Sequence, residues 1–247
     1  MSYVGTNYHG FQIQENALTV QAVFQQALYK LCPEEPDIKA CSRTDSGVHA
    51  KKFCISFPYS GSLDNARLVT ALNHLLPPDI RVLGAVTVPE NFHARYSSVG
   101  KRYVYRIFTA EIMDPFLQGF ALHYPVPFEI GRLNRAAALF IGEHDFHAFA
   151  GSKNTQTDTV RRISRSEFVP CDDEIRYIIE GNGFLYNMVR IIVGTLLNLP
   201  LGKISEEEIL NALNHGTRTR YMPTAPAYGL YLDEVFYAPG DLTNDNT

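Results

Sequence analysis

The feature that most constrains the fold is a segment of 16 residues, Phe184–Leu199, that is apolar on almost every side. A helix that is apolar all round belongs in a core, so we predict a buried helix over residues 184–198. The segment is a poor membrane span, because a span needs about 20 apolar residues and this one contains Asn187 and Arg190. A buried guanidinium needs a partner, and no acidic residue lies within four positions of Arg190. We therefore expect a carboxylate from elsewhere in the chain; the alternative is that Arg190 reaches solvent or caps a carbonyl group.

Patterns of helix and strand appear in two halves of the chain. In the first half we predict a helix over residues 19–31, strands at residues 53–57 and 80–88, and a helix whose N-cap is Ser62. In the second half we predict strands at residues 103–108, 160–169 and 175–180, a helix at about residues 132–141, and a helix opened by a capping box of Ser205 and Glu208. These patterns predict two α/β subdomains, residues 1–98 and 99–247, with a frayed polar tail at residues 240–247.

The composition is that of an ordinary globular protein, with 45% hydrophobic and 19% charged residues. The chain has no long apolar run, and its four cysteines match neither a metal site nor a redox pair, so we expect a cytoplasmic protein with reduced thiols and no membrane contact. The net charge of −4 weakly disfavours a nucleic-acid ligand. However, residues 1–110 hold 11 basic and 8 acidic side chains, and residues 111–247 hold 11 and 18, so we expect any positively charged surface to be local.

A polar stretch, Ser42–Ala50, has the composition of a loop that leads into a strand. Asp45 and Ser46 can simply form a turn in which Gly47 supplies a positive φ. Asp45 can also be the missing partner of Arg190, because a guanidinium favours the ionised form of a nearby carboxylate. The sequence leaves both interpretations of Asp45 open. For His49, a structural hydrogen bond is the simpler interpretation.

Basic and aromatic residues interleave in the stretch Lys101–Arg106. The period of a strand places Tyr103 and Tyr105 on one face, and Arg102 and Arg106 on the other. Such a tyrosine can stack on an unstacked base, or the stretch can be a half-buried strand with solvated arginines.

Two weaker candidates contain histidine. His144 and His147 have a spacing that can ligate a metal, but no third ligand is indicated. The stretch Asn91–Arg95 can place His93 and Arg95 at the mouth of a cleft, and ordinary loop packing explains it equally well.

These stretches make the chain similar to the tRNA pseudouridine synthase A family over nearly its whole length. The resemblance rests on six ordered motifs, of which the Arg-Thr-Asp-x-Gly-Val-His core is the most specific: residues 5–14, 42–50, 92–95, 101–105, 144–146 and 183–190. It implies an α+β pseudouridine synthase fold, in which two ferredoxin-like halves share a mixed, largely antiparallel sheet with a central active-site cleft.

The resemblance also implies roles for individual residues. Asp45 matches the catalytic aspartate, Arg43 the arginine that helps to extrude the target nucleotide, Tyr103 the tyrosine that stacks on the flipped uracil, and Arg190 the basic residue that pairs with the aspartate. We further expect contacts with the substrate from His49, Arg95, Lys101 and Arg102. The implied substrate is tRNA, at uridines 38–40 of the anticodon stem-loop, and the implied assembly is a homodimer.

The implied reaction moves the uracil from N1 to C5 without net oxidation or group transfer, so we expect neither a cofactor nor a metal. In two respects the chain departs from the family. It begins almost at the Gly5 turn, so its first strand is expected to be short, and it has Phe11 where many members have Trp. The rival interpretations are a noncatalytic RNA-binding protein on the same fold and a metal-dependent hydrolase that uses His144 and His147.

Overall fold

The computed structural model describes residues 1–32 and 34–242. They fold into two compact units. The first unit comprises residues 1–100 together with the chain from Tyr231 onward, and the second unit comprises Lys101–Leu230. The predicted subdomains, residues 1–98 and 99–247, stay a prediction. Of the predicted polar tail, residues 243–247 lie outside the described residues.

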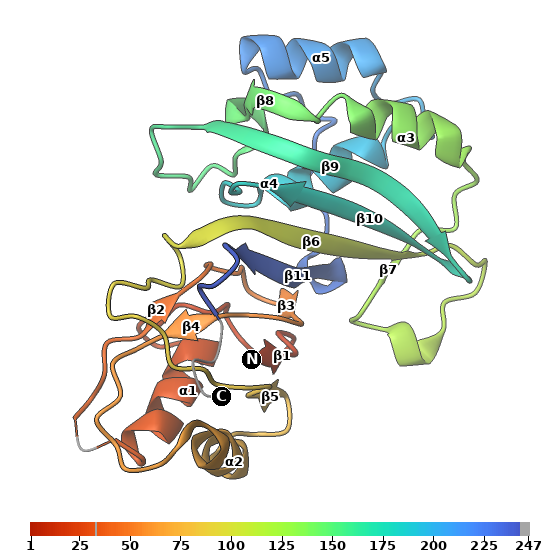
Figure 1. Ribbon diagram of the computed structural model, residues 1–247. Coiled ribbons are helices and arrows are strands. Elements are labelled where there is room, and N and C mark those ends of the chain that lie inside the picture. The colour runs from red at the N-terminus through yellow and green to blue at the C-terminus, as the bar shows by residue number, and fades with distance from the viewer. Residues whose placement is uncertain (33, 243–247) are drawn as a thin grey trace. The chain divides into compact units, whose positions relative to one another are not determined.

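The first unit is built on a small mixed sheet (Figure 1). In this sheet β1 pairs antiparallel with both β5 and β3, and β11 joins β3 in parallel. A separate antiparallel pair is formed by β2 and β4. The strands are β1 (Ser2–Tyr3), β2 (Lys39–Ala40), β3 (His49–Ala50), β4 (Ile55–Ser56), β5 (Ile80–Arg81) and β11 (Leu230–Tyr237). The first strand is short, as expected, and the strands predicted at residues 53–57 and 80–88 are shorter than predicted.

Two helices complete the first unit. The helix α1 (Val20–Tyr29) begins after Thr19, whose hydroxyl accepts a hydrogen bond from Ala22 N–H at 3.4 Å. The helix α2 (Asn65–Leu75) begins after Asp64, so the prediction that Ser62 is its cap was wrong. The reason is that the carboxylate of Asp64 reaches the free amide of the third helical residue at 2.8 Å.

The second unit is built on a sheet whose central strands are long (Figure 1). The strand β10 lies between β6 and β9 and is antiparallel to both, β8 extends the sheet beyond β9, and β7 joins β6 in parallel. The register places Tyr177 opposite both Tyr105 and Phe168. These side chains are buried. The strands are β6 (Ser98–Phe108), β7 (Leu122–His123), β8 (Gly142–Asp145), β9 (Val160–Cys171) and β10 (Glu174–Gly181).

Three helices and three short 3-10 helices belong to the second unit. The helix α3 contacts β9 and α4, and α5 contacts β8. The predicted capping box is confirmed, because Ser205 N–H donates to the Glu208 carboxylate at 2.8 Å and Glu208 N–H donates to Ser205 Oγ at 3.1 Å. These elements are α3 (Ile130–Ala138), α4 (Met188–Leu196), α5 (Glu206–His215), η1 (Pro115–Leu117), η2 (His147–Phe149) and η3 (Ala227–Gly229).

The apolar helix is buried as predicted but shorter than predicted. It begins at Met188 rather than at residue 184, because Asn187 has left-handed backbone angles of φ 61° and ψ 3°. Every residue of α4 except Arg190 is buried. Over the described ranges, no helix combines the length and apolarity needed to cross a membrane. Five α-helices in the described residues and a mixed, mostly antiparallel pairing of strands confirm the α+β class.

Candidate active site

Asp45 lies in the loop between β2 and β3, which we call the Asp45 loop (residues 42–48). Gly47 has a φ of +79°, and Val48 N–H donates to the carbonyl oxygen of Asp45 at 3.1 Å. Gly47 therefore supplies the positive φ that was considered from the sequence. Because the turn is closed by a main-chain oxygen, its closure does not require the carboxylate of Asp45, a residue that is half-buried.

The N-terminal segment of the first unit holds the Asp45 loop in place. The hydroxyl groups of Tyr3 and Thr44 share a hydrogen bond of 2.8 Å. Phe11 N–H donates to Thr44 O at 3.2 Å, and Gly47 N–H donates to Tyr8 O at 3.2 Å. Two main-chain bonds and one side-chain bond from residues 3 to 11 thus hold Thr44 and Gly47, which lie on either side of Asp45.

Gly10 allows this close approach between the two segments. Its φ is +91°, a conformation that other residues rarely adopt. A Cβ atom here would lie 2.6 Å from the carbonyl oxygen of Thr44 and 3.3 Å from the carbonyl carbon of Asp45. Glycine is therefore required by both conformation and space.

Two of the predicted site arginines, both in the first unit, have no acidic partner within the described residues. Arg43 is exposed in the Asp45 loop, and its guanidinium makes no hydrogen bond or ion pair to any described residue. Arg95 is half-buried, and its guanidinium carbon lies 5.8 Å from the ring centroid of Tyr96. Both cations are available to an anionic ligand such as a phosphate.

His49 is 1% exposed at the end of the Asp45 loop. Its Nδ1 accepts a hydrogen bond from Gly5 N–H at 3.1 Å, and its ring stacks on Tyr231 at a centroid distance of 4.6 Å. These contacts connect the loop to β11. The bond from Gly5 is the structural hydrogen bond that the sequence favoured for the His49 imidazole.

The strand β6 carries Tyr103 in the second unit. As the strand period predicts, Tyr103 and Tyr105 are buried while Arg102 and Arg106 are half-buried. The ring of Tyr103 meets the ring of Phe184 edge to face, with centroids 5.1 Å apart and planes at 81°. Phe184 lies just before α4, so Tyr103 is packed against the segment that leads to Arg190.

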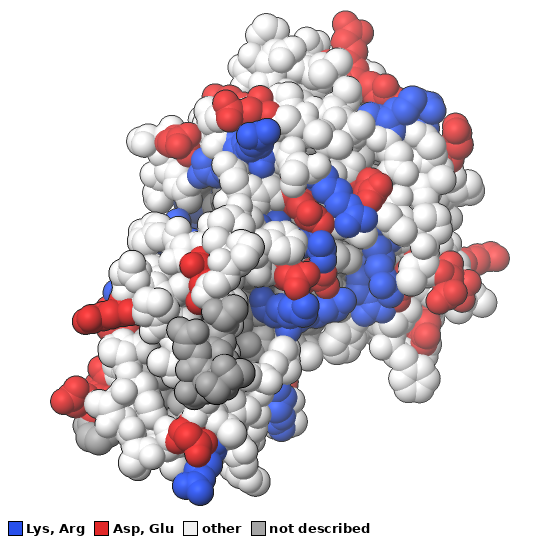
Figure 2. Space-filling view, in the orientation of Figure 1, with Lys and Arg blue, Asp and Glu red and all other residues white. Residues whose placement is uncertain are grey.

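The basic residues next to Tyr103 differ in their surroundings. Lys101 is 9% exposed. Arg102 Nε donates to Glu180 Oε1 at 2.7 Å, and Glu180 also accepts from Arg165 at 3.3 Å. Figure 2 shows basic and acidic side chains lying next to one another on the visible face. Arg102 therefore has a carboxylate partner, which it shares with Arg165, unlike Arg43 and Arg95.

Arg190 is anchored at two points within the second unit. Its Nε donates to the carbonyl oxygen of Ala225 at 2.8 Å, and its Nη1 donates to Asn187 Oδ1 at 2.9 Å. Ala225 N–H in turn donates to Arg190 O at 3.0 Å. The carbonyl cap that was an alternative from the sequence is present, and together with Asn187 it sets the direction of the guanidinium.

The segment that supplies Ala225 is packed tightly on α4. A Cβ on Gly194 would lie 2.1 Å from the carbonyl oxygen of Pro223. Tyr105 supports the next residue by donating to Pro226 O at 2.8 Å. Burial raises the pKa of the Tyr105 phenol, so this group stays neutral and serves as a structural donor.

Of the two histidines considered as metal ligands, His144 has a contact for its ring and His147 has one for its main chain. His144 Nε2 lies 3.0 Å from the carbonyl oxygen of Ile141, and the main-chain N–H of His147 donates to Asp145 Oδ1 at 2.9 Å. In the part of the chain that the structure describes, no three His, Cys, Asp or Glu side chains converge in a group that could hold a metal ion.

The predicted site residues thus fall into two groups. Arg43, Asp45, His49 and Arg95 belong to the first unit, and Lys101, Arg102, Tyr103 and Arg190 belong to the second. Sequence reasoning missed the supporting groups Gly10, Asn187 and the Ala225 carbonyl. A helical spacing of three between Asn187 and Arg190 was the signal that could have identified the first contact of the guanidinium.

Comparison with known proteins gives a match over most of the chain. The sequence model of a family described as tRNA pseudouridine synthase matches residues 1–97 and 136–238. All predicted site residues except the three on β6, Lys101, Arg102 and Tyr103, lie inside these ranges.

Curated proteins that bear the name tRNA pseudouridine synthase A are also similar over nearly their full length. The protein of Thermoanaerobacter sp. (strain X514) is 44% identical over 237 residues, which are 96% of this chain and 97% of the relative. That of Ruminiclostridium cellulolyticum is 43% identical over 238 residues, with the same coverage. That of Staphylococcus aureus (strain MRSA252) is 39% identical over 245 residues, which are 99% of this chain and 93% of the relative.

Proposed function

Because this chain belongs to the tRNA pseudouridine synthase family, we propose that it isomerises uridine to pseudouridine in transfer RNA. The single observation that carries the proposal is the end-to-end similarity to proteins of that name, together with the family motif around Asp45. The reaction breaks the N1–C1′ bond of uridine, turns the uracil and forms a C5–C1′ bond. The resemblance of the motifs makes uridines 38–40 of the anticodon stem-loop the proposed targets.

Asp45 is the proposed catalytic carboxylate. A group that attacks C1′ or C6, or removes the C2′ proton, must be held within a small distance of the reacting atom. The contacts from Tyr3, Phe11 and Gly10 to Thr44 support this role, since they leave the main chain at Asp45 little freedom.

The target nucleotide has to leave its stack before a carboxylate can reach the sugar. We assign Arg43 to the space that the nucleotide vacates, and its exposed guanidinium without a described partner supports this assignment. We assign Tyr103 to the face of the flipped uracil, where base and ring stack. The contact with the Phe184 ring at 5.1 Å supports this role, because it restrains the tyrosine ring.

Arg190 is the proposed partner of Asp45 during the reaction. Its Nε and Nη1 hydrogens are directed at Ala225 and Asn187. A guanidinium held in this way loses little further freedom when it meets a carboxylate, and it favours the ionised form of that carboxylate.

The remaining predicted contacts take supporting roles. Arg95 and Lys101 are proposed to contact the RNA. His49 is proposed to act by holding the Asp45 loop against β11, because its ring is buried. Arg102 is proposed to reach the substrate while it stays paired with Glu180.

The test of the proposed function separates chemistry from binding. We expect Asp45→Asn to reduce pseudouridine formation on a tRNA transcript by roughly 10³-fold or more, with tRNA affinity changed only slightly. The matched control is Asp37→Asn, which removes an exposed carboxylate of the same unit that pairs with Lys39. If Asp45→Asn keeps normal turnover, Asp45 is not catalytic. If the unmodified protein binds tRNA but never forms pseudouridine, the noncatalytic alternative is correct.

We also propose that the protein works in the cytoplasm as a homodimer. The dimer rests on the family resemblance, and the location is supported by tRNA as the substrate and by the four free cysteines. Sedimentation velocity over a range of protein concentrations tests the dimer, and a sedimentation coefficient that remains that of a 27.8 kDa monomer contradicts it.

A further inference from the structure

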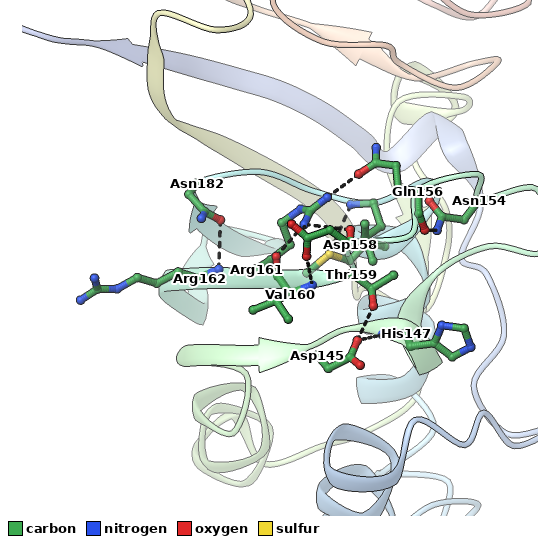
Figure 3. A network of polar contacts seen from close by, with 12 residues as sticks. Asp145, His147, Asn154, Gln156, Asp158, Thr159, Val160, Arg161, Arg162 and Asn182 are labelled. Carbon is green, nitrogen blue, oxygen red and sulfur yellow. Dashed lines mark hydrogen bonds and ion pairs between the residues drawn. The ribbon is translucent and has the colours of Figure 1, made fainter.

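A polar loop of the second unit, residues 151–158, is exposed but is held by several hydrogen bonds. Its residues are Gly, Ser, Lys, Asn, Thr, Gln, Thr and Asp, and most of them are exposed. Asn154 N–H donates to Gly151 O at 2.8 Å, and the Asn154 side chain donates to Gln156 O at 3.0 Å. We call this segment the polar loop, and Figure 3 shows the contacts around it.

Arg161 fastens the end of the polar loop. Its Nη1 donates to the carbonyl oxygens of Val160 at 2.6 Å and of Asp158 at 3.3 Å, and its Nη2 donates to the side-chain oxygen of Gln156 (Figure 3). Its side chain is 14% exposed. The Arg161 guanidinium therefore connects the loop to the start of β9, and its positive charge is directed at acceptors within the protein.

The strand that carries Arg161 is itself fixed. Asn182 receives a hydrogen bond from Arg162 N–H at 2.9 Å, and Asn182 N–H donates to Arg162 O at 3.0 Å. Asp145 accepts from Thr159 Oγ1 at 2.5 Å and from His147 N–H at 2.9 Å (Figure 3). The chain that directly follows the polar loop is thus bonded to two other segments, at Asp145 and at Asn182.

The N-terminal end of the polar loop lies on the residues that position Arg190. Gly151 N–H donates to Tyr186 O at 2.8 Å. A Cβ on Gly151 would lie 2.7 Å from the ring of Tyr186 and 2.9 Å from the side-chain nitrogen of Asn187. Since Asn187 holds Arg190, the polar loop starts next to the proposed catalytic arginine.

The charges of the polar loop leave one cation facing outward. Asp158 accepts from Val160 N–H at 3.0 Å and forms an ion pair of 3.8 Å with Arg161. Lys153 is exposed, and its amine makes no hydrogen bond or ion pair within the described ranges. The Asp158 carboxylate thus takes part in the network although its side chain is 81% exposed, and the Lys153 amine has no partner among the described residues.

The side chains around Lys153 match one class of ligand. Ser152, Thr155 and Thr157 are exposed and carry hydroxyl groups. Lysine amines and the hydroxyls of Ser and Thr are typical donors to the phosphate oxygens and sugars of nucleic acids. A loop that is ordered before binding also loses less conformational entropy when the ligand arrives.

From these contacts we propose that the polar loop is a binding site for the phosphodiester backbone of the substrate RNA, with Lys153 as its phosphate contact. The inference rests on the proposed function and extends it, because it assigns a second point at which the RNA strand is held beside the flipped nucleotide. Arg161 is a positioning residue in this site, since it acts on the RNA only through the loop.

The first experiment compares Lys153→Gln with a matched control, Lys203→Gln. Lys203 is an exposed lysine of the same unit that likewise has no hydrogen-bond or ion-pair partner for its amine among the described residues. We expect Lys153→Gln to raise KM for tRNA several-fold with kcat unchanged, and to reduce the slope of log Kd against log salt by about 1. We expect Lys203→Gln to leave both unchanged. Equal KM and equal salt slope for wild type and Lys153→Gln overturn the proposal.

The second experiment tests the organisation of the loop. Arg161→Lys keeps the charge but loses the forked contacts, so we expect a raised KM, an unchanged kcat and faster amide exchange in residues 151–158. Unchanged KM and exchange contradict the positioning role.

The binding measurements also keep the two proposals apart. If the wild type binds tRNA through Lys153 but makes no pseudouridine, the proposed function fails while this site stands. If it makes pseudouridine and Lys153→Gln is silent, only this site fails.

Discussion

Asn187 and Arg190 form a closed turn at the start of α4, in which the left-handed backbone of Asn187 brings its Oδ1 to 2.9 Å from Arg190 Nη1. The same residue ends the loop that precedes the helix, and so one side chain sets both where α4 begins and where its guanidinium points. Asn is among the few residues other than Gly that adopt left-handed angles readily. The position therefore requires both a particular backbone conformation and an acceptor.

We predict that Asn187→Gly lowers kcat by about 10-fold while KM for tRNA stays the same. Glycine keeps the left-handed backbone but removes the acceptor, and misplacing a catalytic group by about 1 Å can lower the rate by up to about 10²-fold. Asn187→Ala is expected to lose the same activity and also about 1 kcal/mol of stability, from left-handed strain. Steady-state kinetics and urea unfolding measure the two effects. Normal kcat in Asn187→Gly would show that the Ala225 carbonyl alone positions Arg190.

We predict that Gly10→Ala destabilises the protein by about 1–3 kcal/mol and lowers activity. The new Cβ would lie 2.6 Å from Thr44 O in a backbone conformation with φ +91°, so the peptide before Asp45 has to move. Gly84→Ala is the control, because a Cβ there meets no atom within 4 Å. Thermal unfolding and turnover of both variants are compared with those of the wild type, and equal losses in the two variants contradict the prediction.

For Tyr103→Phe we predict that most of the tRNA affinity and turnover are retained. The ring that packs on Phe184 at 5.1 Å is preserved, and stacking on a base does not require the hydroxyl. Tyr103→Ala removes the ring, and we expect it to lose about 1–3 kcal/mol of interaction with the base. Single-turnover kinetics distinguish the two variants. A large loss of rate in Tyr103→Phe assigns the hydroxyl to proton transfer.

We predict that the protein loses stability as the pH rises above about 10, the ordinary pKa of a tyrosine. Burial raises the pKa of both Tyr105 and Tyr177. Their contribution to stability is complete below the pKa of the unfolded phenols. Above it the unfolded chain binds fewer protons than the folded chain, and the free energy of unfolding falls by about 1.4 kcal/mol per pH unit for each phenol.

Urea unfolding between about pH 8 and about pH 11 measures this slope. Tyr177→Phe is the informative control, because Ser166 keeps its hydrogen bond to Ala137 O at 2.7 Å when the phenol is lost. We expect this variant to have a shallower slope at alkaline pH. A stability that is constant over the whole range contradicts the assignment.

Local chemistry made several elements predictable. The capping box of Ser205 and Glu208 predicted where α5 begins. The alternation around Tyr103 predicted which side chains of β6 are buried. The start of α4 was missed because the left-handed backbone of Asn187 makes the helix begin at Met188, four residues after the apolar segment begins at Phe184. The apolar pattern predicts that the segment is buried, which is correct here. It does not predict the turn that precedes the helix.

The supports of the candidate site were harder to predict for a different reason. The Ala225 carbonyl that receives Arg190 is 35 positions away in sequence, and any residue carries a carbonyl group. Gly10 is recognisable as necessary only when Thr44 is seen against it. The side chains expected to do chemistry have distinctive types, whereas the groups that hold them are main-chain atoms and glycines.

The return of β11 to the first unit has a consequence for biosynthesis. His49 pairs in register with Tyr231, so the sheet beside the Asp45 loop is completed by a strand that the ribosome makes some 180 residues later. Contacts of such long sequence separation form slowly. The nascent first unit therefore has to wait with one sheet edge open while the second unit emerges, and the Asp45 loop acquires its full support only near the end of translation.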